Sequence, residues 1–112
     1  MKVSDLVREL ELFVFCGETG LDSQISGGYT SDLLSDVMGH MEEGMLWITM
    51  QTHQNILAVA ALKDAAAVLI VNGAKPDEET IAKGSEEDVP LLGTTLSAFE
   101  ATGKIYQLLQ KA

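Results

Sequence analysis

Polar side chains gather at three points where a predicted strand ends. They follow the apolar runs that close at Met50, Val71 and Leu92. In open parallel sheets, ligands bind outside the carboxyl ends of the strands, where helix N-termini also expose unpaired amides. The alternative is that these hydroxyl and amide groups only cap helices. We predict a ligand-binding edge that comprises Gln51, Thr52, His53, Gln54, Asn55, Asn72, Gly73, Thr94 and Thr95.

A glycine pair marks a further candidate segment. The residues from Gly27 and Gly28 through Tyr29 and Thr30 are predicted to form a turn into a helix, where backbone amides could bind an anion. No Gly-x-x-x-x-Gly-Lys-Ser/Thr or Gly-x-Gly-x-x-Gly motif is present, and no lysine lies in the turn. Any phosphate site here would be non-standard and short of cations.

His53 is the side chain best suited to acid–base chemistry, since an imidazole can donate, accept or gain a proton near neutral pH. We favour a hydrogen bond to the backbone or a capping role, because no matching nucleophile or acid is identifiable. The catalytic alternative is a small enzyme in which Thr52, Gln54 or Asn72 positions the substrate. The two histidines and the single cysteine show no metal-ligand spacing, so we expect neither a metal nor a cofactor.

Charge and cysteine content exclude several classes of partner. Seventeen acidic residues against seven basic ones give a net charge of −10, which opposes binding to nucleic acids or anionic membranes. No apolar run is long enough to span a bilayer. One cysteine allows no internal disulfide, which is typical of a reducing compartment, and we therefore expect a cytoplasmic protein. A small molecule or another protein remains as the expected partner.

Hydrophobic periodicity predicts an alternation of helices and strands that would position these residues. Helices are expected over 4–10, 31–40, 55–64, 77–85 and 97–110, and strands over 12–16, 46–50, 67–71 and 90–93. This order predicts a single α/β domain over residues 1–112, with a mostly parallel sheet of about four strands flanked by helices. The helix at 55–64 is apolar nearly all round, which favours burial on more than one side and a homodimer.

Two stretches, Gly27 to Met38 and Trp47 to Ile56, resemble the DRTGG domain family. The resemblance continues through Ile70–Gly73 and Leu96–Glu100 and so covers nearly the whole chain. It implies an accessory or regulatory domain of the kind found in some pyrophosphatases with CBS domains and in some phosphotransacetylases. It also extends to the N-terminal domain of HPr kinase/phosphorylase, but not to the P-loop domain of that enzyme.

The family motif is incomplete in this chain. Gln24-Ile25-Ser26-Gly27-Gly28 keeps the glycine pair but lacks the aspartate and the arginine, whose guanidinium would be the obvious partner of a phosphate. Our leading hypothesis is a non-catalytic regulatory or ligand-sensing module. It would bind an adenine nucleotide, a phosphorylated metabolite or a partner protein at the carboxyl edge of the strands. The alternatives are the small enzyme that uses His53 and a purely structural protein-interaction domain, whose encounters the charge of −10 would steer.

Overall fold

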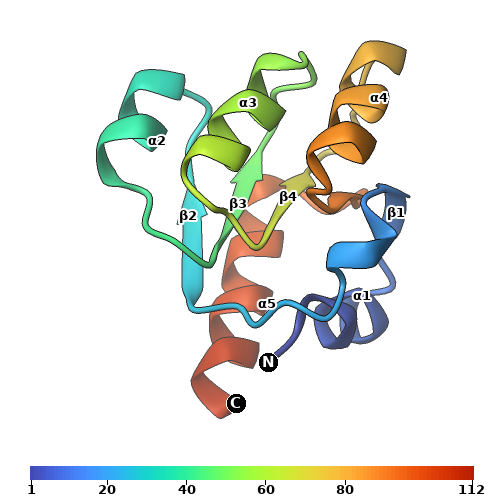
Figure 1. Ribbon diagram of the computed structural model, residues 1–112. Helices are drawn as coiled ribbons and strands as arrows, with labels where there is room; N and C mark the ends of the chain where they lie inside the picture. Colours follow the sequence, from blue (N-terminus) through green and yellow to red (C-terminus); the bar gives the residue numbers. More distant parts are fainter.

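One five-stranded sheet organises the chain, and the computed structural model describes all of it, from Met1 to Ala112 (Figure 1). The strands lie in the order β1-β5-β4-β3-β2. Strands β2 to β5 pair in parallel, whereas β1 is antiparallel to β5. The strands are β1 (Phe13–Cys16), β2 (Gly27–Thr30), β3 (Met45–Thr49), β4 (Ala67–Ile70) and β5 (Leu91–Gly93).

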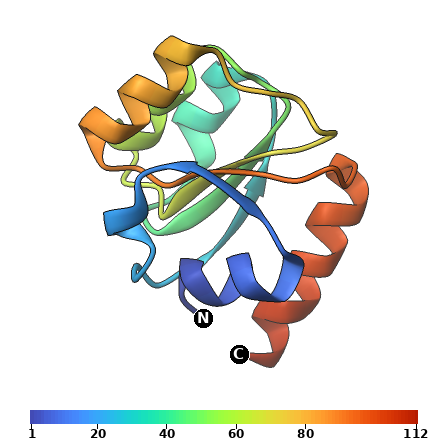
Figure 2. The same cartoon turned by 90° about the vertical axis from the view of Figure 1, so that its right-hand side faces the viewer.

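The helices form one layer on each face of the sheet (Figures 1 and 2). Helices α2 (Leu34–His40), α3 (Asn55–Leu62) and α4 (Glu78–Glu87) connect successive parallel strands, and α1 (Val3–Leu10) and α5 (Ala98–Lys111) cover the other face. Neighbouring parallel strands follow one another in sequence, so right-handed crossovers place all three connecting helices on one face. The predicted α/β class and mostly parallel sheet are confirmed. A 3-10 turn at Glu18–Gly20 lies between β1 and β2. None of the helices has the length and apolar character of a membrane-spanning segment.

Strand β4 is the centre of the core, as its continuous apolar sequence predicts. All four of its residues are buried, with Val68 and Ile70 facing α2 to α4 and Ala67 and Leu69 facing α1 and α5. Trp47 on β3 is fully buried in the first of these two layers, and its indole N–H donates to the Ser31 carbonyl at 2.9 Å. Each large side chain removed from water in this way contributes about 1.5–3 kcal/mol.

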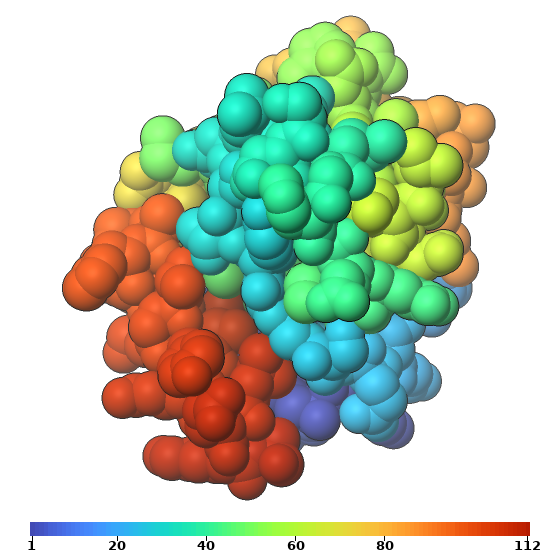
Figure 3. All heavy atoms as spheres, turned by 90° about the vertical axis from the view of Figure 1, so that its left-hand side faces the viewer, coloured from blue at the N-terminus to red at the C-terminus, as the bar shows by residue number.

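The sequence-based interpretation of residues 27–30 is wrong, because they form β2 and not a turn. Gly27 lies opposite Met45 and Thr30 opposite Ile48, in a parallel ladder with β3. Figure 3 views the molecule from this edge and shows the β2 region between α2 and α5. The glycine pair indicated a turn locally, but pairing with a neighbouring strand outweighs such local preferences. The sheet therefore has five strands instead of about four.

The second helix begins at Leu34, three residues later than predicted. Asp32 lies outside this helix, and its carboxylate accepts hydrogen bonds from the Thr49 hydroxyl at 2.8 Å and the Met50 N–H at 2.7 Å. These bonds tie the segment after β2 to the end of β3, whereas the helix predicted over 31–40 would have placed Asp32 in its first turn.

Two apolar elements are less buried than their sequences predict. Phe13 opens β1 and is 62% exposed, because β1 is an edge strand and not a buried one. Helix α3 packs Ile56, Leu57 and Ala60 into the core but leaves Leu62 69% exposed. An apolar sequence all round a helix therefore corresponds here to one packed face and one exposed face.

Candidate functional site

The carboxyl ends of the four parallel strands meet at one edge of the sheet. This edge carries the segments that follow β2, β3, β4 and β5, and antiparallel β1 begins at the same end. Phe13, the first residue of β1, lies opposite Gly93, the last residue of β5. An antiparallel neighbour thus adds an aromatic side chain to an edge that the parallel strands alone would leave polar.

Main-chain hydrogen bonds hold the segment after β4 against the segment after β5. The Asn72 N–H donates to the Leu96 carbonyl and the Gly73 N–H to the Thr94 carbonyl, both at 2.8 Å. Asn72 and Gly73 adopt left-handed φ values of 62° and 66°, which glycine and asparagine tolerate better than most residues. The predicted candidates Asn72, Gly73, Thr94 and Thr95 are therefore neighbours in the structure.

A cavity of about 430 Å³, which we call the aromatic pocket, opens beside these segments. A Cβ atom at Gly93 would stand 2.5 Å from Cε2 of Phe15, so the Phe15 ring occupies the space above this glycine. Only glycine at position 93 leaves room for that ring. The pocket is lined by Phe13, Phe15, Gly73, Ala74, Lys75, Gly93, Thr94 and Thr95.

The aromatic pocket is also lined by hydrogen-bond donors and contains no acidic side chain. Lys75 is exposed and forms no salt bridge. The backbone N–H groups of Lys75 and Thr95 have no acceptor in the protein, and the Thr95 hydroxyl is also unpaired. Thr94 is buried, and its hydroxyl accepts from the Leu96 N–H at 3.2 Å. An anionic group is the chemical complement of unpaired donors and an ammonium group.

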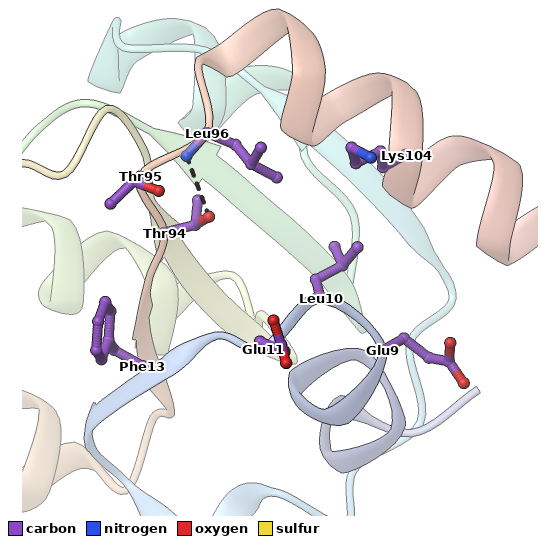
Figure 4. A pocket seen from close by; sticks show the side chains of 8 residues that line it. All are labelled: Glu9, Leu10, Glu11, Phe13, Thr94, Thr95, Leu96 and Lys104. Carbon is purple, nitrogen blue, oxygen red and sulfur yellow. Dashed lines mark hydrogen bonds between the residues drawn. The ribbon is translucent and has the colours of Figure 1, made fainter.

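A second cavity of about 440 Å³, the acidic pocket, adjoins the first and shares Phe13, Thr94 and Thr95 with it. Figure 4 shows Glu9 and Glu11 at the end of α1 and Lys104 projecting from α5. Helices α1 and α5 cover one face of the sheet, whereas the aromatic pocket adjoins the segment before α4 on the other face. The lining comprises Glu9, Leu10, Glu11, Phe13, Thr94, Thr95, Leu96 and Lys104.

The predicted segment from Gln51 to Asn55 lines neither pocket. Thr52 supplies its carbonyl to the Thr80 hydroxyl at 2.6 Å, and the Gln51 side chain donates to the Asp32 carbonyl at 2.9 Å. Gln54 and Asn55 are exposed. These contacts join neighbouring segments of the edge and place no convergent group in a cavity.

His53 forms a hydrogen bond with the backbone, as its position in the sequence favoured. Its Nδ1 atom accepts the Asn55 N–H at 3.1 Å and so satisfies the first backbone donor of α3. The ring is exposed, and no side-chain acid or nucleophile forms a hydrogen bond with it.

The residues of β2 lie away from both pockets. Gly28 and Thr30 line a small hollow of about 70 Å³ against α5, and the Thr30 and Thr102 hydroxyls lie 2.9 Å apart. On the opposite face, the Tyr29 hydroxyl donates to Asp36 at 2.8 Å. This bond lowers the pKa of Asp36 and raises the pKa of Tyr29. No cavity adjoins this pair, and no group of three potential metal ligands occurs in the structure.

Sequence reasoning missed the aromatic and cationic members of the aromatic pocket. The sequence predicted a strand over 12–16, which contains Phe13 and Phe15, and a strand over 90–93, which ends at Gly93, but gave no role to Lys75. Alternation of Phe13 and Phe15 on one face of a strand was the available signal. It becomes informative only once β1 is known to be antiparallel to β5.

Comparisons with known proteins support the resemblance found in the sequence. The model of the DRTGG domain matches residues 5–108. Among solved structures, the chain is similar to the CBS and DRTGG domains of the regulatory region of Clostridium perfringens pyrophosphatase, complexed with the activator diadenosine tetraphosphate. The TM-score is 0.75 at 14% identity, over 95% of this chain and 46% of that one, so this chain spans about half its length. This likeness shows the fold alone. No curated protein matches the sequence.

Proposed function

The chain belongs to the DRTGG domain family, and we propose that it is a non-catalytic regulatory domain that senses a small molecule in the aromatic pocket. The observation that carries the proposal is this cavity of about 430 Å³, whose volume falls within the usual range for small-molecule sites, about 300–1,000 Å³. Two aromatic side chains and a few convergent donors are the lining expected of such a site.

The position of the pocket supports a sensing role. It lies where the segments after β4 and β5 meet, and the backbone bonds of Asn72 and Gly73 join them. A ligand held by Gly73 and Thr95 would contact both segments at once and stabilise their arrangement. Its binding would therefore be transmitted to the starts of α4 and α5, which those segments precede.

More specifically, we propose that the ligand is an adenine nucleotide or another phosphorylated metabolite. Phe13 and Phe15 offer aromatic surface to a base, and Lys75 offers charge to a phosphate. Thermal unfolding with a panel of adenine nucleotides, phosphorylated sugars and acyl phosphates tests it. A ligand at a hundred times its Kd stabilises the protein by about 2.7 kcal/mol, which such an assay detects.

A matched pair of variants locates the binding. Phe13→Ala removes an exposed wall of the pocket, and Phe99→Ala removes an exposed ring outside it. We expect ligand-induced stabilisation to fall in the first variant and to persist in the second. No stabilisation by any member of the panel, or equal loss in both variants, would refute small-molecule sensing at this pocket.

We further propose that the domain acts in the cytoplasm as a homodimer. Leu62, Phe99 and Leu33 are exposed apolar side chains, and a small domain has a reason to cover such groups. Sedimentation equilibrium at micromolar concentration checks this part: a purely monomeric protein would contradict it without affecting the pocket.

A further inference from the structure

The walls of the aromatic pocket select a flat ring. Phe13 is largely exposed, and Phe15 covers Gly93, so two aromatic surfaces and two glycines border the cavity. Aromatic rings pack against one another in offset or edge-to-face arrangements that branched or saturated groups cannot form. A planar ring would therefore gain more from these walls than a sugar or an aliphatic chain of similar size.

The donors at the same pocket select one anionic group. The Lys75 ammonium and the Thr95 hydroxyl have no protein partner, and the backbone N–H of each residue is also unpaired. No glutamate or aspartate lines this cavity. A phosphate or carboxylate would satisfy several of these donors at once with charge-assisted bonds.

A second or third phosphate would find no comparable partner. The adjoining acidic pocket contains one lysine, Lys104, and this lysine shares the cavity with Glu9 and Glu11. The chain as a whole carries a net charge of −10, which repels each additional negative charge on a ligand. The volume of about 430 Å³ also lies toward the lower end of the usual range, about 300–1,000 Å³.

We propose that the aromatic pocket binds a planar aromatic compound with a single anionic group, of about nucleoside monophosphate size, and that Lys75 and Thr95 hold that group. This inference rests on the proposed ligand-sensing function and narrows its ligand class. It excludes a dinucleoside polyphosphate from this pocket on grounds of both charge and size.

Isothermal titration calorimetry on the full chain tests the proposal with five probes. Adenosine monophosphate and indole-3-carboxylate represent the phosphate and carboxylate sources of the same chemistry. Adenosine lacks the negative charge, and inorganic phosphate lacks the aromatic ring. Diadenosine tetraphosphate carries more charge and is larger than the proposed site accommodates. We expect one of the first two to bind at least about tenfold more tightly than each of the other three, since a charge-assisted bond is worth that factor or more.

Variants assign the anionic group to its partners. Lys75→Gln and Thr95→Val are expected to lower the affinity for the best probe by about tenfold and to leave that for adenosine unchanged. Lys104→Gln is the matched control in the acidic pocket and should change neither affinity. All three positions are surface-accessible, and thermal unfolding of each variant confirms that it folds.

The possible results separate this inference from the function on which it rests. Tighter binding of diadenosine tetraphosphate or adenosine overturns the ligand class while pocket binding stands. Equal losses from Lys75→Gln and Lys104→Gln overturn the assignment of the anionic group to Lys75 and Thr95. Stabilisation only by a non-aromatic member of the broader metabolite panel would also overturn the proposed ligand class but not binding at the pocket. Absence of binding by all five probes and by that panel overturns both.

Discussion

Two glycines inside helices should respond in opposite ways to the same substitution. Gly103 lies within α5, and a Cβ atom there would meet nothing within 4 Å. Gly84 lies within α4, where a Cβ atom would stand 2.4 Å from Sγ of Cys16 and 3.5 Å from Leu57. Alanine exceeds glycine in helix propensity by about 1 kcal/mol at each position. Only at Gly84 is that gain opposed by a steric conflict.

The expected magnitudes follow from these two surroundings. Gly103→Ala should raise the free energy of unfolding by up to about 1 kcal/mol. Overpacking a close-packed core costs about 1–3 kcal/mol, so Gly84→Ala should leave stability unchanged or lower it by up to about 2 kcal/mol. The two variants should therefore differ by about 1–3 kcal/mol.

Urea unfolding followed by tryptophan fluorescence measures this difference, since Trp47 is the single tryptophan and is fully buried. If Gly84→Ala proves as stabilising as Gly103→Ala, the packing of α4 against β1 is not as described. A double variant sharpens the test. Cys16→Ala removes the atom that a Cβ at Gly84 would strike, so adding Gly84→Ala should then cost less than it does in the wild-type background.

Four other predictions use the polar contacts and the thiol. Asp32→Ala should lower the free energy of unfolding by about 1–2 kcal/mol, measured in urea, because it removes two hydrogen bonds at the end of β3; an unchanged midpoint would contradict this. The bond from Tyr29 raises stability only while Asp36 is ionised and lowers the pKa of that carboxyl. This contribution should therefore be lost as pH falls below the ordinary value of 3.8, and acid unfolding of Asp36→Asn should lack that component. In a Tyr106→Phe background, the absorbance titration of Tyr29 should have its midpoint above 10.0, and Asp36→Asn should move it back towards that value. Burial raises the pKa of the Cys16 thiol, so a disulfide reagent should react with it only as the protein unfolds; rapid reaction with the native protein would show that α4 does not cover it.

Local sequence was informative wherever a segment's own pattern matched its surroundings. The uninterrupted apolar run of β4 predicted a strand covered on both faces, and all four residues are buried. Ser97 followed by Glu100 forms a capping box at the start of α5, close to the predicted boundary at residue 97. The alternation of such segments was enough to predict the parallel α/β architecture and the edge at which ligands are expected.

Pairing between distant segments limited the prediction elsewhere. Gly27 and Gly28 carry the local signal of a turn, yet they pair with Met45 and Leu46 in a ladder that only the folded chain provides. Asp32 has the spacing of a helix-start residue, but its carboxylate is held by groups at the end of β3. In both cases a partner more than ten residues away decides the conformation.

The sequence by itself determined the class of the fold and the family resemblance. It also determined the low cation content that argues against polyanionic partners. Composition, periodicity and motif spacing are sufficient for these conclusions, because they are properties of the chain alone. The tertiary structure decided which candidate residues converge. Thr94 and Thr95 meet Gly73 and Lys75 because β4 and β5 are adjacent, and Phe13 joins them because β1 runs antiparallel. The order of the strands and the antiparallel direction of β1 arise from packing between segments far apart in the chain, which no local pattern encodes.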